Sequence, residues 1–301
     1  MSTQKIIPHL WFDKNAEEAV KFYTSLFKGG KILNTTRYTE AGKDIHGMDA
    51  GEVMTVNFQI EGYNLIALNG GPLFKFTPAI SFMVNCTTKD EVDDLWSKLS
   101  VGGTALMPLD AYPFSERYGW IQDTYGLTWQ LIYTDKIPQR KIVPSLMFAG
   151  EQAGKAEEAM NFYISLFEDS RVGQIARYGA DQAPDTEGTV MYADFTLAGQ
   201  IFAAMDSAQA HAFTFNEAIS LLVTCKDQEE IDHFWNALSA VPESEQCGWL
   251  KDRYGVSWQI APEGMEQILN TSDTEKARKA MDAVLSMKKF DIAKLKEAVE
   301  E

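Results

Sequence analysis

The sequence has few cysteines, a deficit of basic residues and no long hydrophobic run, and each shortage excludes a class of protein. Its 301 residues contain three cysteines, Cys86, Cys225 and Cys247, an odd and sparse set without CxxC spacing that indicates reduced thiols. The chain has 27 basic and 43 acidic residues, which gives a formal net charge of −16. Because such a chain repels phosphates, we expect no nucleic-acid partner and no anionic membrane partner, although local arginines can still capture a small anion.

No apolar run approaches the roughly 18–20 residues that are needed to cross a bilayer. Residues 1–5 lead directly into a strand-like segment, without the apolar core of a signal peptide. Together with the reduced thiols, these features predict a cytoplasmic protein that is a monomer or a homodimer.

The sequence has the composition of an ordinary globular protein, and several of its segments occur twice. Hydrophobic residues make up 45% of the chain and charged residues 23%, and the length is about twice that of a typical domain. Four segments recur in order: 5–12 at 141–148, 17–27 at 157–167, 76–96 at 215–235, and 119–130 at 248–259. Four collinear matches do not arise by chance, so the chain is a duplication with its boundary near 137–140.

Each copy predicts the order β-α-β-β-β twice. In the first copy, alternating segments predict strands at 5–12, 31–38, 52–60, 63–69, 79–86, 104–109, 118–123 and 127–133, and amphipathic stretches predict helices at 15–27 and 88–99. A single βαβββ unit has one apolar sheet face and no partner layer, so two units must combine. We therefore expect an α+β fold with tandem domains at 1–137 and 141–262.

The remaining segment, 263–301, lies outside the repeat and predicts a C-terminal helical tail. Ser272 to Glu275 resembles a capping box, and apolar residues follow it at helical spacing. A partly frayed acidic tail is the alternative for its end.

Several motifs carry a resemblance to a known family. They are Asn69-Gly70-Gly71-Pro72, the segment 215–220, the segment 247–259 with its Asp-x-x-Gly-x-x-Trp-Gln element, and the ending 287–292. They resemble the PhnB-like, demethylubiquinone-methyltransferase-like branch of the vicinal-oxygen-chelate superfamily, over nearly the whole chain. The resemblance implies that the two βαβββ units of each domain form a half-open mixed β-barrel around a small-molecule cavity.

The resemblance also raises the question of a metal. Enzymes of the superfamily usually hold a divalent metal through four barrel positions filled by His, Glu or Gln. Strand-by-strand matching assigns these positions to Ile7, Ala67, Ala79 and Gln130 in the first copy and to Val143, Ala204, Ala218 and Gln259 in the second. Aliphatic and amide side chains are poor ligands, so we predict no metal and no cofactor, with a weak site formed by His9 and Gln130 as the alternative.

His9 is the most informative single residue. It lies two residues beyond the first of these positions, on the same strand face, and its counterpart in the second copy is Ser145. It is either an acid/base or hydrogen-bond donor lining the cavity, or a buried histidine satisfied by the backbone. Gln130 and Gln259 should likewise contact a ligand or neighbouring strands.

The full set of predicted ligand-binding residues comes from both copies: His9, Trp11, Asn69, Ser81, Trp120, Gln130, Ser145, Asp206, Ser220, Trp249 and Gln259. The tryptophans among them can equally belong to the core, because aromatic residues dominate small-barrel interiors. A methyl donor would need a glycine-rich turn in a doubly wound sheet, and the isolated glycine pairs here lack that setting.

Three functions remain open. The first is a metal-free protein that binds a small organic molecule, which the missing ligand set favours. The second is a metal-dependent isomerase, lyase or dioxygenase of the superfamily. The third is a metal-independent enzyme with His9 as general base and Gln130 orienting the substrate. In each case we expect the first copy to hold the main site, because the second replaces His9 with a serine and has a shorter segment before its last hairpin.

Overall fold

The computed structural model describes residues 4–40, 42–265 and 274–300. It divides the chain into two compact α+β units, each built around one mixed sheet. Unit 1 comprises Met1–Ser25, Gly29–Phe74 and Glu217–Glu301, and unit 2 comprises Leu26–Lys28 and Lys75–Asn216. The predicted α+β class is confirmed, and neither sheet closes into a complete barrel.

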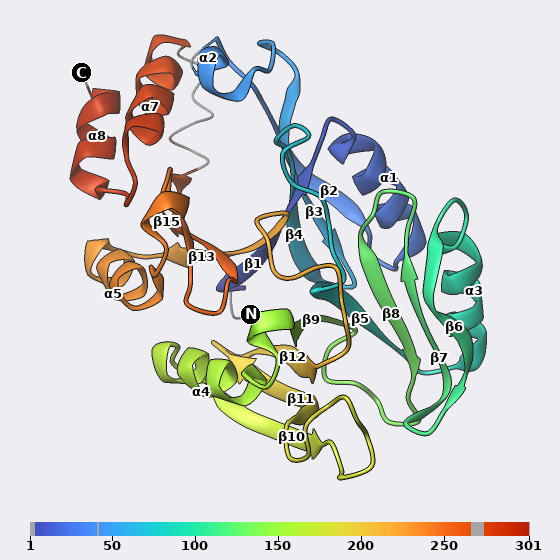
Figure 1. Cartoon of the computed structure of the whole chain (residues 1–301). Helices are drawn as coiled ribbons and strands as arrows, with labels where there is room; N and C mark the ends of the chain where they lie inside the picture. Colours follow the sequence, from blue (N-terminus) through green and yellow to red (C-terminus); the bar gives the residue numbers. More distant parts are fainter. Residues whose placement is uncertain (1–3, 41, 266–273, 301) are drawn as a thin grey trace. The chain divides into compact units, whose positions relative to one another are not determined.

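Unit 1 contains a seven-stranded sheet with the order β14-β15-β13-β1-β4-β3-β2 (Figure 1). Its strands are β1 (Ile6–Phe12), β2 (Lys31–Arg37), β3 (Val53–Ile60), β4 (Tyr63–Asn69), β13 (Ile219–Cys225), β14 (Trp249–Lys251) and β15 (Ser257–Pro262). Its helices are α1 (Ala16–Leu26), α2 (Lys43–His46), α5 (Gln228–Leu238), the 3₁₀ turn η2 (Pro242–Ser244), α7 (Thr274–Ser286) and α8 (Ile292–Glu300).

Helix α1 shows how the sequence positions the layers of unit 1. Ala16, Ala19, Val20 and Tyr23 recur at helical spacing and are all buried. Tyr23 stacks on Phe58 of β3, with ring centroids 6.4 Å apart. Since side chains alternate along a strand, residues beside Phe58 turn to the opposite face of the sheet. We call that opposite face, which carries His9, the His9 face.

Unit 2 contains an eight-stranded sheet with the order β10-β11-β12-β9-β5-β8-β7-β6. Its strands are β5 (Ile80–Cys86), β6 (Thr104–Tyr112), β7 (Ser115–Gln122), β8 (Thr128–Tyr133), β9 (Ile142–Ala149), β10 (Arg171–Arg177), β11 (Val190–Leu197) and β12 (Gln200–Ser207). Its helices are α3 (Lys89–Leu99), the 3₁₀ turn η1 (Gly150–Gln152) and α4 (Ala156–Leu166). The corresponding sheet face, which we call the Ser145 face, carries an apolar cluster of Met83, Val143 and Ala203.

The two units cut across the two copies of the repeat. Strand β1 of the first copy pairs antiparallel with β13 of the second, from Ile6 opposite Val223 to Leu10 opposite Ile219. Strand β5 pairs in the same way with β9. The predicted bounds 1–137 and 141–262 therefore mark the two copies in the sequence, whereas each compact unit takes one βαβββ half from each copy. The sequence alone could not select the partner, because equivalent strand edges in the two copies have the same pattern.

The second copy is shorter at one place, as the sequence predicted. Where the first copy has strand β6, the second has only the 3₁₀ turn η2 before β14. The backbone N–H groups of Cys247 and Gly248 beside β14 instead donate to the carbonyls of Met287 (2.8 Å) and Lys288 (2.7 Å) in the tail. The tail thus satisfies backbone donors at this sheet edge.

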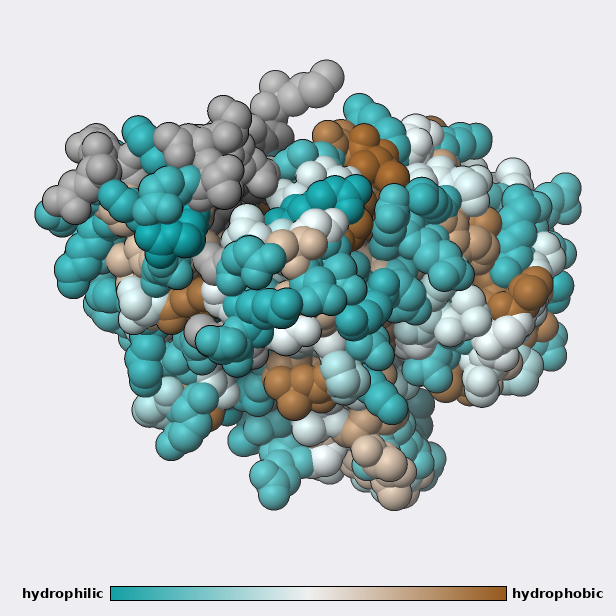
Figure 2. All heavy atoms as spheres, turned by 90° about the horizontal axis from the view of Figure 1, so that it is seen from above, coloured by the Kyte–Doolittle hydropathy of each residue, from teal (hydrophilic) through white to brown (hydrophobic). Residues whose placement is uncertain are grey.

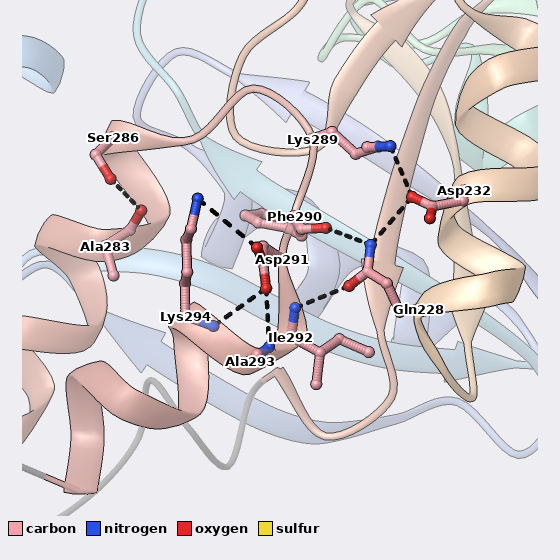
Figure 3. A network of polar contacts seen from close by, with 10 residues as sticks. All are labelled: Gln228, Asp232, Ala283, Ser286, Lys289, Phe290, Asp291, Ile292, Ala293 and Lys294. Carbon is pink, nitrogen blue, oxygen red and sulfur yellow. Dashed lines mark hydrogen bonds and ion pairs between the residues drawn. The ribbon is translucent and has the colours of Figure 1, made fainter.

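The predicted helical tail is confirmed for α7 and α8, while Ser272 and Asp273 of the expected capping box lie outside the described residues. Figure 3 shows how the tail docks on α5: Gln228 donates to the carbonyl of Phe290 (3.1 Å) and accepts from the N–H of Ile292 (2.9 Å). Lys289 forms an ion pair with Asp232 at 2.6 Å.

The surface is largely polar on the face drawn in Figure 2, where hydrophilic residues predominate and hydrophobic residues form small, separate groups. Among the helices of the described segments, none is long and apolar enough to cross a membrane.

Candidate functional site

The centre of the candidate site is His9 on β1, which is only 7% exposed. Its Nδ1 lies 2.6 Å from Nε2 of Gln259, and the same Gln259 nitrogen lies 2.8 Å from Oγ of Ser220. The strand register brings these residues together. His9 is directly opposite Ser220, and Gln259 is opposite Leu222, which shares a face with Ser220. Three predicted site residues thus meet on the His9 face.

The protonation state of His9 follows from this environment. Burial lowers the pKa of His9 to about 4, so the imidazole is neutral near pH 7. The Gln259 amide nitrogen is a donor with two hydrogens, and its contacts place them on His9 Nδ1 and Ser220 Oγ. With Nδ1 accepting, the ring proton is on Nε2. His9 is therefore arranged to donate a hydrogen bond from Nε2.

Aromatic side chains flank His9. Trp249 on β14 is opposite Gln259, and its ring lies edge-on to His9 with centroids 5.8 Å apart. Trp11 follows on the same face of β1, 6.1 Å from Trp249 and 5.0 Å from Phe74. Phe74 was missed in the sequence analysis, since nothing in its local pattern distinguishes it from a loop phenylalanine.

The Asn69-Gly70-Gly71-Pro72 motif supports the aromatic side chains beside His9. The indole N–H of Trp11 donates to the carbonyl of Gly71 at 2.8 Å. A Cβ atom on Gly70 would lie 2.3 Å from the Trp11 ring, so a glycine is needed for this close approach. The motif therefore fixes Trp11 and, through it, one side of the site.

Unit 2 repeats the arrangement without a histidine. Ser145 takes the place of His9 opposite Ser81, whose hydroxyl accepts from Nε2 of Gln130 at 2.7 Å. Tyr118, which the sequence analysis missed, donates to Oε1 of Gln130 at 2.8 Å. Its position two residues before Trp120, on the same strand face, was the available signal. Ser145 Oγ and Trp120 Nε1 are buried and have no hydrogen-bond partner in the described chain.

The structure groups some of the candidate residues differently from the sequence analysis. Two alternatives paired His9 with Gln130, but these residues belong to different units, and the side chain bonded to His9 is Gln259. The reason is the exchange of halves between the copies. The four positions of the first copy that match the superfamily's metal ligands are also divided between the units. Ile7 and Ala67 fall in unit 1, whereas Ala79 and Gln130 fall in unit 2.

Asn69 and Asp206, both predicted ligand-binding residues, are engaged by the backbone instead. Asn69 accepts from the N–H of Ala16 (2.9 Å) and donates to the carbonyl of Val53 (2.9 Å). Asp206 accepts from the N–H groups of Ala156 (3.0 Å) and Val190 (2.9 Å). Each therefore anchors the start of a helix, α1 or α4, to its sheet.

The residues around His9 do not fit the divalent metal that the superfamily implies. Gln259 and Ser220 are neutral donors, and no carboxylate joins them in the hydrogen-bonded cluster. Within residues 4–40, 42–265 and 274–300, no group of three or more His, Cys, Asp or Glu side chains is placed to hold a metal ion. Nor do the mixed sheets provide the doubly wound setting that a methyl-donor nucleotide requires, since Gly70 and Gly71 pack against Trp11.

Comparison with known proteins identifies the family. The family model for 3-demethylubiquinone-9 3-methyltransferase matches residues 4–132 and again 140–261. A 3-demethylubiquinone-9 3-methyltransferase-type PhnB protein from Bacillus cereus is 40% identical over 44% of this chain and 100% of its own, with a TM-score of 0.40. Glyoxalase I from Zea mays is 13% identical over 85% of this chain and 92% of its own, with a TM-score of 0.51, which shows a shared fold.

No curated protein matches the sequence. The family model nevertheless covers most of the chain, once in each copy. The chain therefore belongs to the 3-demethylubiquinone-9 3-methyltransferase family, as a tandem duplication.

Proposed function

We propose that unit 1 binds a small, uncharged organic molecule on the His9 face and that it does so without a metal. The observation that carries this proposal is a buried, neutral His9 that Gln259 holds with its Nε2 proton free to meet an acceptor. The tryptophan and phenylalanine rings beside it would take the apolar or aromatic body of the ligand.

The contrast with Asn69 supports a binding role for His9. Asn69 is equally buried, but its polar atoms are used by backbone groups of its own unit. The His9 side chain instead bonds to another side chain, Gln259, which in turn contacts Ser220. A connected polar network inside an apolar face costs desolvation, and a ligand acceptor at Nε2 would offset part of that cost.

The two enzymatic alternatives have less support. A general base works best when its pKa is near the operating pH, and a pKa of about 4 leaves His9 a weak base at neutral pH. A metal-dependent reaction needs charged or imidazole ligands, whereas the neighbours of His9 are an amide and a hydroxyl. Binding is the role that this chemistry favours.

The test is the variant His9→Ser. Serine already occupies the equivalent position 145, so the fold should be retained, while binding of the co-purified or screened small molecule should fall by at least about tenfold, as expected for loss of a buried hydrogen bond. Native mass spectrometry would identify the molecule in the wild-type protein and measure its loss, and circular dichroism would monitor the fold.

Ser145→Ala in unit 2 is the matched control and should retain the ligand of unit 1. Unchanged binding in a folded His9→Ser protein would reject the proposal. Elemental analysis of protein purified without chelators would test the metal-free part, and about one transition metal per unit would overturn it.

A further inference from the structure

A pocket in unit 2 has chemistry that differs from the His9 site. It has a volume of about 250 Å³ and lies where the segment before β9 meets the ends of β10, β11 and β12. Its lining residues are Gln139, Arg140, Asp169, Arg171, Thr196, Gly199 and Ile201. Two arginines and one aspartate give it a local positive excess, in a chain whose formal net charge is −16.

The two pocket arginines differ from the other two arginines of unit 2. Arg117 contacts Asp93 at 2.6 Å, and Arg177 contacts Glu157 through two nitrogens at 2.6 and 2.9 Å. Arg171, in contrast, reaches Asp169 only at 3.9 Å. Both side chains of this pair are largely exposed, so the pair contributes little.

Arg140 has no ion pair with any residue from 75 to 216, all of which are described. Its backbone is fixed, because its carbonyl accepts from Nδ2 of Asn85 on β5 at 3.0 Å. Arg140 and Arg171 thus both line the pocket, where the carboxylate of Asp169 pairs with Arg171 only at 3.9 Å. Guanidinium groups match carboxylates through paired, charge-assisted hydrogen bonds.

The strand register adds one apolar side chain, Ile201, to this largely polar pocket, and we call it the apolar floor. Arg171 is directly opposite Thr196, and Thr196 is directly opposite Ile201, so the three side chains form a row on one face. Thr196 is only 8% exposed, and its hydroxyl forms no hydrogen bond with the described residues. Ile201 packs against the apolar cluster that includes Val143 on the Ser145 face.

We propose that this pocket binds a small organic acid, with the carboxylate on Arg140, Arg171 and the Thr196 hydroxyl and the apolar part over Ile201. Two positive side chains at one end and a hydrophobic floor at the other select an anion that carries an apolar group. This pocket in unit 2 is separate from the site that we propose for an uncharged ligand at His9 in unit 1. Either proposal can therefore fail without the other.

The probe is 4-fluorobenzoate, followed by ¹⁹F NMR with the full-length protein. We expect saturable binding that weakens at least about tenfold in each of Arg140→Gln and Arg171→Gln, since each removes a charge-assisted hydrogen bond. Arg117→Gln removes the same charge elsewhere in unit 2 and should leave binding unchanged. Any binding of the uncharged 4-fluorobenzamide should be the same in Arg140→Gln and Arg171→Gln as in wild type, because it would occur at the His9 face of unit 1. Acetate should compete weakly with the benzoate because it lacks the apolar part.

Benzamide binding that is as tight as that of the benzoate and is weakened equally by Arg140→Gln and Arg171→Gln would overturn the proposal, because the carboxylate would then be unnecessary. Equal competition by acetate or inorganic phosphate would overturn the apolar floor. If His9→Ser lost benzoate binding while both pocket arginine variants kept it, the benzoate would bind in unit 1. That result would reject the proposed pocket site.

Discussion

His9 should make the stability of the protein depend on pH in a defined direction. In the folded protein its pKa of about 4 lies below the ordinary histidine pKa of 6.5. Between these values the unfolded chain takes up a proton that the folded chain refuses, so the free energy of unfolding falls as the pH falls from about 6.5 toward 4. Above 6.5 neither state is protonated and the effect disappears.

The expected size follows from about 1.4 kcal/mol for each pKa unit. Between pH 7 and pH 5, His9 should lower the free energy of unfolding by about 2 kcal/mol. Urea denaturation of wild type and of His9→Gln at both pH values isolates this contribution, because the carboxylates are common to the two proteins. An equal pH dependence in both proteins would show that His9 is not buried and neutral as described.

At the scale of the element, Asp206 anchors the start of α4 through two backbone N–H groups. Asp206→Ala removes the acceptor of two backbone N–H groups, of Ala156 and Val190, and should destabilise unit 2 by about 2 kcal/mol. Thermal or urea denaturation would measure this, with the exposed Asp181→Ala as the matched control. If Asp206→Ala lost ligand binding without losing stability, Asp206 would instead be a ligand-binding residue.

One side chain of α5, Gln228, makes two hydrogen bonds to the backbone of the tail, beside the ion pair of Asp232 with Lys289. Gln228→Ala removes its hydrogen bonds to the Phe290 carbonyl and the Ile292 N–H, so the tail should open more often. Hydrogen exchange should then be faster at α8 and at the N–H groups of Cys247 and Gly248, which bond to the tail. The exposed Glu229→Ala on the same helix should leave these rates unchanged, and equal rates in both variants would contradict this account.

At the scale of the whole molecule, the exchange of halves makes one copy incomplete. A fragment of residues 4–137 contains β1 and β5, whose antiparallel partners β13 and β9 belong to the other copy. Two fragments can restore both pairings by joining β1 of one to β5 of the other, because these edges are equivalent. We expect a homodimer by light scattering, and a folded, monomeric fragment would contradict the exchange.

Much of the fold could be predicted from the sequence because its signals are local. The helix from Ala16 and the strand from Ile6 begin within a residue or two of their predicted positions, since apolar periodicity and glycine termini depend only on neighbours in the chain. The family could also be recognised, because the 247–259 motif recurs in order with its counterpart in the first copy.

His9, Ser220, Trp249 and Gln259 were all named from the sequence as candidate ligand-binding residues, and that role stays a prediction. Two alternatives paired His9 with Gln130, whereas the side chain bonded to His9 is Gln259. Asn69 was included because a polar side chain at a strand end is compatible with either a ligand or a helix start. Only the neighbouring N–H of Ala16 distinguishes the two.

The sequence by itself determined the duplication, the order of the elements, the acidic composition and the residue types on each strand face. All of these depend on spacing along one chain. Tertiary structure alone decided which half of one copy pairs with which half of the other, and therefore that His9 meets Gln259. The physical reason is that β1 presents the same backbone hydrogen bonds to β5 or to β13, so the choice between them depends on the packing of the complete units rather than on any local pattern.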